Sequence, residues 1–113
     1  MDSNYEWIKL GDKMILIENM VSEEDLETGM KKYNSPPQHG MLFIMGDRYS
    51  YLTMKGVKFP LDIIFFDKNR QPIPINTKNK STYWLRAYPE QEDVLLPRET
   101  YYMIEFPAGL VYP

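Results

Sequence analysis

The stretch LTMKGVKFPLDIIFFD, residues 52–67, decides the fold. Its centre, LDIIFF at residues 61–66, is an apolar run rich in β-branched and aromatic residues, with one carboxylate, Asp62. The run is too short for a typical buried helix, and apolar residues at nearly every position are typical of a strand covered on both faces. Pro60 can begin such a strand but cannot lie inside it. We therefore predict a central strand over residues 61–66 that the rest of the chain must cover.

Further strands are predicted on both sides of this run by short apolar or alternating segments. They occupy residues 6–10, 13–18, 40–45, 49–54, 71–75, 82–87 and 101–106. Gly11-Asp12 suits a tight turn between the first two, because glycine accepts a positive φ without steric cost. Two prolines place residues 71–75 at a sheet edge, since proline has no backbone donor. Residues 76–81 are predicted to be a polar loop.

One helix is predicted from Ser22 to Lys32. Ser22 can cap it, Asp25 can reach back to the cap, and Val21 can pack on Leu26. Acidic residues fill the first turn and lysines the last, as the helix dipole favours. The residues expected on its apolar face are Leu26, Met30 and Tyr33.

These elements define the fold class. Seven or eight short strands at close spacing and one short amphipathic helix predict a mainly β (α+β) protein. With 113 residues, one domain over residues 1–113 is the default. We expect a single compact, antiparallel, β-barrel-like domain.

Composition narrows the function classes. The net charge is −3 and the basic residues are scattered, which argues against nucleic-acid binding. The absence of cysteine excludes disulfides and thiolate chemistry. The chain has neither a signal-peptide pattern nor an apolar run of about 20 residues, so we expect a cytoplasmic protein away from membranes. We expect no cofactor, because the phosphate-binding and dinucleotide motifs are missing, and a monomer or weak homo-oligomer.

Asp62 is the foremost candidate for chemistry, because a carboxylate in a buried strand needs a partner. In one interpretation it is an acid or base with a shifted pKa in a cleft, with Lys55 or Lys58 nearby. In the other it is structural and accepts hydrogen bonds from backbone N–H groups or from Lys55. Glu105, expected on the same side of its strand as Met103, either pairs with Asp62 as a catalytic carboxylate or faces solvent at a rim.

Metal chemistry has little support in the sequence. His39 is the only histidine, which excludes sites built on two or more, and it is expected at the surface. The acidic runs at residues 23–25 and 90–93 do not match a calcium-binding loop. We therefore expect no metal site.

A binding face is the other candidate. Flat aromatic residues are common where small molecules or partner proteins dock. Lys55 can meet an anion, because Gly56 beside it allows close approach of the backbone. The candidate binding residues are Met54, Lys55, Lys58, Tyr83, Trp84 and Tyr88.

Three blocks of sequence carry a family resemblance. They are GMLF at residues 40–43, MK at 54–55 followed by PLDIIFFD at 60–67, and IEFPAG at 104–109. In this order and spacing the chain resembles the domain of unknown function 192 (DUF192) family of uncharacterised bacterial and archaeal proteins, over residues 14–109. The resemblance implies a compact β-rich domain and no established reaction. Family members usually continue further, so the chain resembles a C-terminally shortened version, as a phage would carry.

Two hypotheses of different classes follow. The first is a non-catalytic module that binds an unknown protein or small-molecule partner at one end of the barrel, near residues 54–60. The second is a small hydrolase-like enzyme that uses Asp62 with Glu105 or Lys55. The enzyme requires Asp62 to line an open pocket beside a second titratable group.

Overall fold

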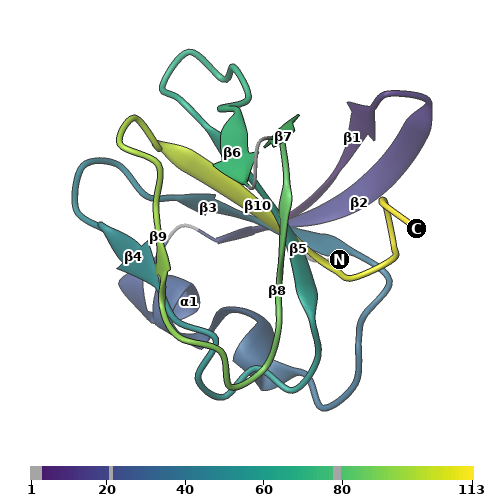
Figure 1. The fold of residues 1–113 in the computed structure, drawn as a ribbon. Coiled ribbons are helices and arrows are strands. Elements are labelled where there is room, and N and C mark those ends of the chain that lie inside the picture. Colours follow the sequence, from purple (N-terminus) through teal and green to yellow (C-terminus); the bar gives the residue numbers. More distant parts are fainter. Residues whose placement is uncertain (1–3, 21, 78–79) are drawn as a thin grey trace.

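The computed structural model describes residues 4–20, 22–77 and 80–113 of the chain (Figure 1). Within them the strands are β1 (Tyr5–Leu10), β2 (Lys13–Met20), β3 (Gly40–Ile44), β4 (Tyr51–Leu52), β5 (Leu61–Phe66), β6 (Ile75–Thr77), β7 (Lys80–Thr82), β8 (Leu85–Ala87), β9 (Val94–Leu95) and β10 (Tyr102–Pro107). The helices are α1 (Glu23–Thr28) and the 3-10 helix η1 (Gly29–Lys32). The predicted fold class, mainly β with one short helix, is confirmed.

Six strands form one curved sheet in the order β1-β2-β3-β10-β5-β8, which leaves β1 and β8 as its edges. The sheet is therefore barrel-like rather than a closed barrel. The expectation of antiparallel pairing is wrong at one place, because β2 and β3 run parallel. The physical reason lies in their connection, since α1, η1 and the following loop carry the chain back to the end at which β2 began.

The predicted central strand is confirmed as β5, which pairs with β10 on one side and β8 on the other. Its side chains alternate between two apolar clusters, as the pleat of a strand requires. Leu61, Ile63 and Phe65 point to the face that α1 and η1 cover, which we call the helix-side face. Ile64 points to the opposite face, where it meets Phe106 of β10 and Val111, which follows β10. We call this the far face.

The predicted helix is shorter than residues 22–32. Its cap is confirmed, because the Ser22 hydroxyl accepts a hydrogen bond from the backbone N–H of Asp25 at 3.0 Å. The α-helix ends at Thr28, and Gly29 follows with a φ of 45°, a conformation that favours glycine. The predicted apolar face is also confirmed, with Met30 buried in the helix-side face and Leu26 and Tyr33 packed against it. Val21 lies outside the described residues.

Two further predictions need correction. The strand expected over residues 49–54 is reduced to β4, which pairs with β9, a strand that the sequence did not indicate. The polar loop expected over residues 76–81 instead contributes backbone to the two-stranded sheet of β6 and β7, and residues 78–79 lie outside the described part of the chain. Strand pairing here overrides a polar composition. In the described residues no helix is long and apolar enough to cross a membrane.

Candidate functional site

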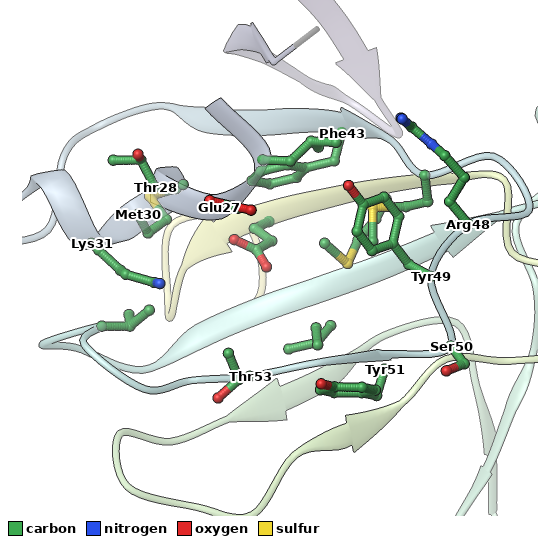
Figure 2. A pocket seen from close by; sticks show the side chains of 17 residues that line it. Glu27, Thr28, Met30, Lys31, Phe43, Arg48, Tyr49, Ser50, Tyr51 and Thr53 are labelled. Carbon is green, nitrogen blue, oxygen red and sulfur yellow. The ribbon is translucent and has the colours of Figure 1, made fainter. Parts of the chain in front are cut away.

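A pocket of about 550 Å³ opens on the helix-side face (Figure 2). Helices α1 and η1 form one wall, the loop of residues 46–50 and strand β4 form the others, and β3 and β10 contribute the inner surface. Figure 2 shows Glu27 and Thr28 on the helical side, with Tyr51 and Thr53 opposite them. The apolar lining residues are Leu26, Met30, Phe43, Met45, Leu52, Val57 and Met103.

Glu105 is the only acidic group in this lining that is buried, with 7% of its surface exposed. It lies on β10 and faces the same side as Met103, as the alternation of the strand predicts. Burial alone raises the pKa of Glu105 to about 7, and no hydrogen bond or ion pair from the described residues favours its charged form. The expectation of a solvent-facing rim position for Glu105 is therefore wrong. Its carboxylate is available to a group inside the pocket.

Asp62 has a different environment. It is fully buried and faces the far side, where Arg86 Nε donates to its Oδ1 at 2.7 Å and Arg86 Nη2 to its Oδ2 at 3.0 Å. The backbone N–H of Gly109 donates to Oδ2 at 3.2 Å. Arg86 Nη2 also donates to the carbonyl oxygen of Tyr112, which ties the C-terminal segment to the sheet. Because both oxygens are satisfied, the geometry matches the structural interpretation of Asp62.

The cation beside Asp62 is thus Arg86, whereas the sequence suggested Lys55 or Lys58. Asp62 and Arg86 are directly opposite residues of β5 and β8. The hydrogen bonds to Asp62 raise the pKa of Arg86. The signal that could have found this partner is a charged residue in the predicted strand 82–87, combined with the register of the two strands, which the sequence does not give.

Asp62 and Glu105 do not meet. In the register of β5 and β10, Asp62 is opposite Phe106 and Glu105 is opposite Ile63. Cross-strand partners share a face of the sheet, so Asp62 lies with Phe106 on the far face and Glu105 lies with Ile63 on the helix-side face. The sheet itself separates the two carboxylates, and a catalytic pair cannot form between them.

The other predicted binding residues lie around the pocket or away from it, and none of them lines it. Met54 is buried in the helix-side core, at 1% exposed. Lys55 is exposed, and the Lys58 ammonium donates to the carbonyl oxygen of Lys31. Tyr83 and Tyr88 are each more than half exposed. Trp84 stacks on Tyr112 with the ring centroids 4.5 Å apart.

A second buried carboxylate network was missed by the sequence analysis. Glu18 of β2 accepts hydrogen bonds from the Lys32 ammonium and the Tyr33 hydroxyl, and lies 3.1 Å from His39 Nε2. Burial acts to raise the pKa of Glu18, but the hydrogen bonds from these three side chains outweigh it and lower the pKa. The His39 side chain is only 13% exposed, so its expected surface position is wrong. The network joins β2 to η1 and the following loop.

Comparison with known proteins settles the family. The model of the DUF192 family, described as Uncharacterized ACR, matches residues 7–112. The chain belongs to the DUF192 family. The match extends past both ends of the resemblance seen in the sequence. None of the curated protein sequences matches the chain.

Two solved structures share the fold of this DUF192 domain. One is a protein of unknown function from Novosphingobium aromaticivorans DSM 12444, with a TM-score of 0.65 and 18% identity over 93% of this chain and 73% of that one. The other is described as a putative transcription regulator from Sinorhizobium meliloti 1021, with a TM-score of 0.54 and 21% identity over 98% of this chain and 88% of that one. At these identities the likeness shows the fold alone.

Proposed function

We propose that this DUF192 domain is a non-catalytic binding module that holds a small molecule in the pocket between α1, η1, β4 and β10. The observation that carries the proposal is a buried carboxylate, Glu105, which has no partner among the described residues and lies in the wall of a pocket with both apolar and polar lining residues. Ligand sites in proteins are typically apolar hollows of about 300–1,000 Å³ with a few placed polar groups. The volume of about 550 Å³ falls in that range.

The hydrolase alternative has no comparable support. It needs Asp62 beside Glu105 or Lys55 in an open cleft. Asp62 is fully buried, bound by Arg86 and Gly109, and on the opposite face of the sheet from Glu105. A general acid or base must reach the group whose proton it moves, and this arrangement leaves Asp62 no such access.

The proposal is tested with a panel of neutral, cationic and anionic fragments, followed by the backbone amide signals of the protein in ¹H–¹⁵N NMR spectra. We expect some fragments to shift the signals of pocket residues such as Phe43 and Met103, which lie on different strands. Thr28→Trp places a large side chain at an exposed position in the pocket wall, so it should abolish these shifts.

The matched control is Glu24→Trp, which adds the same side chain to an exposed position of α1 outside the pocket lining. It should leave fragment binding unchanged. If no fragment of any charge shifts the pocket signals, or if Thr28→Trp and Glu24→Trp behave alike, the pocket is not a binding site and the proposal fails.

A further inference from the structure

We infer that the ligand of this pocket is an amine, a molecule with an apolar body and one cationic amino group that pairs with the Glu105 carboxylate. The inference rests on the proposed function, since it names the chemical class that the same pocket takes. It depends on the placement of one buried carboxylate in a partly apolar pocket and on the charges that surround it.

Glu105 lacks a hydrogen-bond donor among the described residues. Buried polar groups in proteins almost always have a hydrogen-bond partner, and the other buried carboxylates described here follow this rule. Asp62 is held by Arg86 and Gly109, and Glu18 by Lys32 and Tyr33. Glu105 differs, because nothing in the described residues donates to it, and its carboxylate oxygens are open to the pocket instead of being fully enclosed. A donor brought by a ligand would satisfy it.

A positively charged donor would bind Glu105 more strongly than a neutral one. An ammonium group forms a charge-assisted hydrogen bond with a carboxylate, about twice as strong as a neutral one. Besides Glu105, the charged groups that line the same pocket are Glu27 from α1, Lys31 from η1 and Arg48 from the loop before β4, and all three are exposed to solvent. Figure 2 shows the Lys31 ammonium directed toward the pocket and the Arg48 guanidinium directed away from it. The Lys31 ammonium forms no ion pair with Glu105, so an ammonium from a ligand would supply the buried positive charge that Glu105 lacks.

The side chains of the pocket walls indicate what the rest of the ligand is. The pocket lining includes several aromatic and methionine side chains, which are Phe43, Tyr49, Met30, Met45 and Met103. Aromatic faces attract both apolar groups and cations. Methionine is flexible and adapts to ligands of different shape. These walls favour an apolar or aromatic amine over a polyamine or a sugar.

The test compares two probes of nearly the same shape, phenethylamine and phenethyl alcohol, by titration followed in NMR spectra or by calorimetry. We expect the wild-type protein to bind phenethylamine more tightly than the alcohol at neutral pH. Glu105→Gln keeps the size of the side chain but removes its charge, so it should lower the affinity for phenethylamine about 10- to 100-fold. The affinity of the variant for phenethyl alcohol should stay within about twofold of the wild-type value, because the apolar part of the pocket lining is unchanged.

A second readout uses the wild-type protein alone. Because the pKa of Glu105 is raised to about 7, a cation must displace its proton at lower pH. The affinity for phenethylamine should therefore rise roughly 30-fold between about pH 5.5 and about pH 8. The alcohol should show no such rise. This measurement stands even if Glu105→Gln does not fold.

The outcomes separate the two proposals. Equal binding of amine and alcohol by the wild-type protein, or amine affinity that is unchanged in Glu105→Gln, overturns the amine inference and leaves the binding module standing. Failure of every probe and fragment to shift pocket signals overturns the binding module itself. Binding of phenethylamine that Thr28→Trp does not weaken places the amine elsewhere and overturns the inference.

Discussion

Asp62 and Glu105 are both buried carboxylates on neighbouring strands, and their surroundings give them opposite roles. Asp62 accepts three hydrogen bonds, two from a guanidinium and one from a backbone N–H group. Glu105 has none from the described residues and lines a pocket. A charge that is buried with partners fixes structure, whereas one buried without them costs stability and is more typical of a functional site.

The first prediction concerns Glu105 and pH. Its pKa rises from about 4.5 to about 7 on folding, so the folded state favours the protonated form. The stability that the proton contributes is complete below about pH 4.5 and is lost as the pH rises through 7. Since a tenfold change in an equilibrium is about 1.4 kcal/mol, the loss amounts to roughly 3 kcal/mol. Urea unfolding of wild type and Glu105→Gln between about pH 4 and about pH 8 measures it.

As the pH rises across this range, the free energy of unfolding of Glu105→Gln is expected to increase relative to that of wild type, because glutamine does not ionise. All other titrating groups are common to both proteins, so the difference between them isolates Glu105. A difference in the free energy of unfolding that stays constant with pH would contradict the raised pKa.

The second prediction concerns the pair of Asp62 and Arg86. The Arg86 side chain is 29% exposed and Asp62 is fully buried. Arg86→Met therefore leaves a buried carboxylate with only Gly109 as donor, and should destabilise the fold by about 3–5 kcal/mol. Asp62→Asn should cost less, because the guanidinium keeps its bond to Tyr112 and its access to water.

The double variant tests whether the two side chains act together. Its loss of stability, measured by urea unfolding, should be smaller than the sum of the two single losses by at least about 1 kcal/mol. Additive losses would mean that the two side chains do not interact in solution, and the structural role of Asp62 would have to be abandoned.

At the scale of the element, α1 illustrates how a short helix depends on its ends. It has six residues, too few to be stable alone, so its cap and its packing on the sheet must hold it. Ser22 supplies the cap through its hydroxyl, and Leu26 packs against the helix-side core. The same helix forms one wall of the pocket, which links its stability to the site.

The third prediction follows for this helix. Ser22→Ala should destabilise the protein by about 1 kcal/mol, and Ser22→Asp, which keeps a capping oxygen, should lie close to wild type. Thermal or urea unfolding measures both. Equal losses in the two variants would show that the cap does not contribute.

The helix also shows why its length was overestimated. The apolar positions and the charges of residues 22–32 suit an α-helix throughout. Gly29 adopts a positive φ with the Phe43 ring against it, where a Cβ would lie 3.4 Å from the ring. This change of direction ends α1 and places Met30 in the core. The positive φ at Gly29 is required by packing against β3, so no pattern within residues 22–32 predicts it.

At the scale of the whole molecule, stability is expected to concentrate in the middle of the six-stranded sheet. β10 is paired with β5 over its whole length and with β3 from Tyr102 to Glu105, and its side chains are buried on both faces. The sheets of β4 with β9 and of β6 with β7 have two strands each. Small two-stranded sheets open at low cost in free energy.

The fourth prediction is therefore an order of hydrogen exchange. The amides of β10 and β5 that bond to neighbouring strands should exchange at least about 100-fold more slowly than those of β6, β7, β4 and β9. Exchange followed by NMR or mass spectrometry checks this order. Comparable rates in the two groups would show that the small sheets open only with the whole molecule.

The sequence by itself determined the elements whose signals are local. The apolar run at residues 61–66 is β5, Gly11-Asp12 joins the first hairpin, and Ser22 caps the helix. Backbone propensity, alternation of apolar residues and helix capping each act over a few residues, so the sequence alone can predict them. The family resemblance, carried by blocks of sequence, was likewise confirmed.

Only the tertiary structure decided the parallel pairing of β2 with β3, the partnership of Asp62 with Arg86 and the pocket around Glu105. Each depends on which strands become neighbours and in which register. A shift of one residue would move Asp62 to the opposite face of the sheet, and such long-range choices leave no local signal. The sequence shows a carboxylate at position 105, but only the assembled sheet shows that this carboxylate lines a pocket.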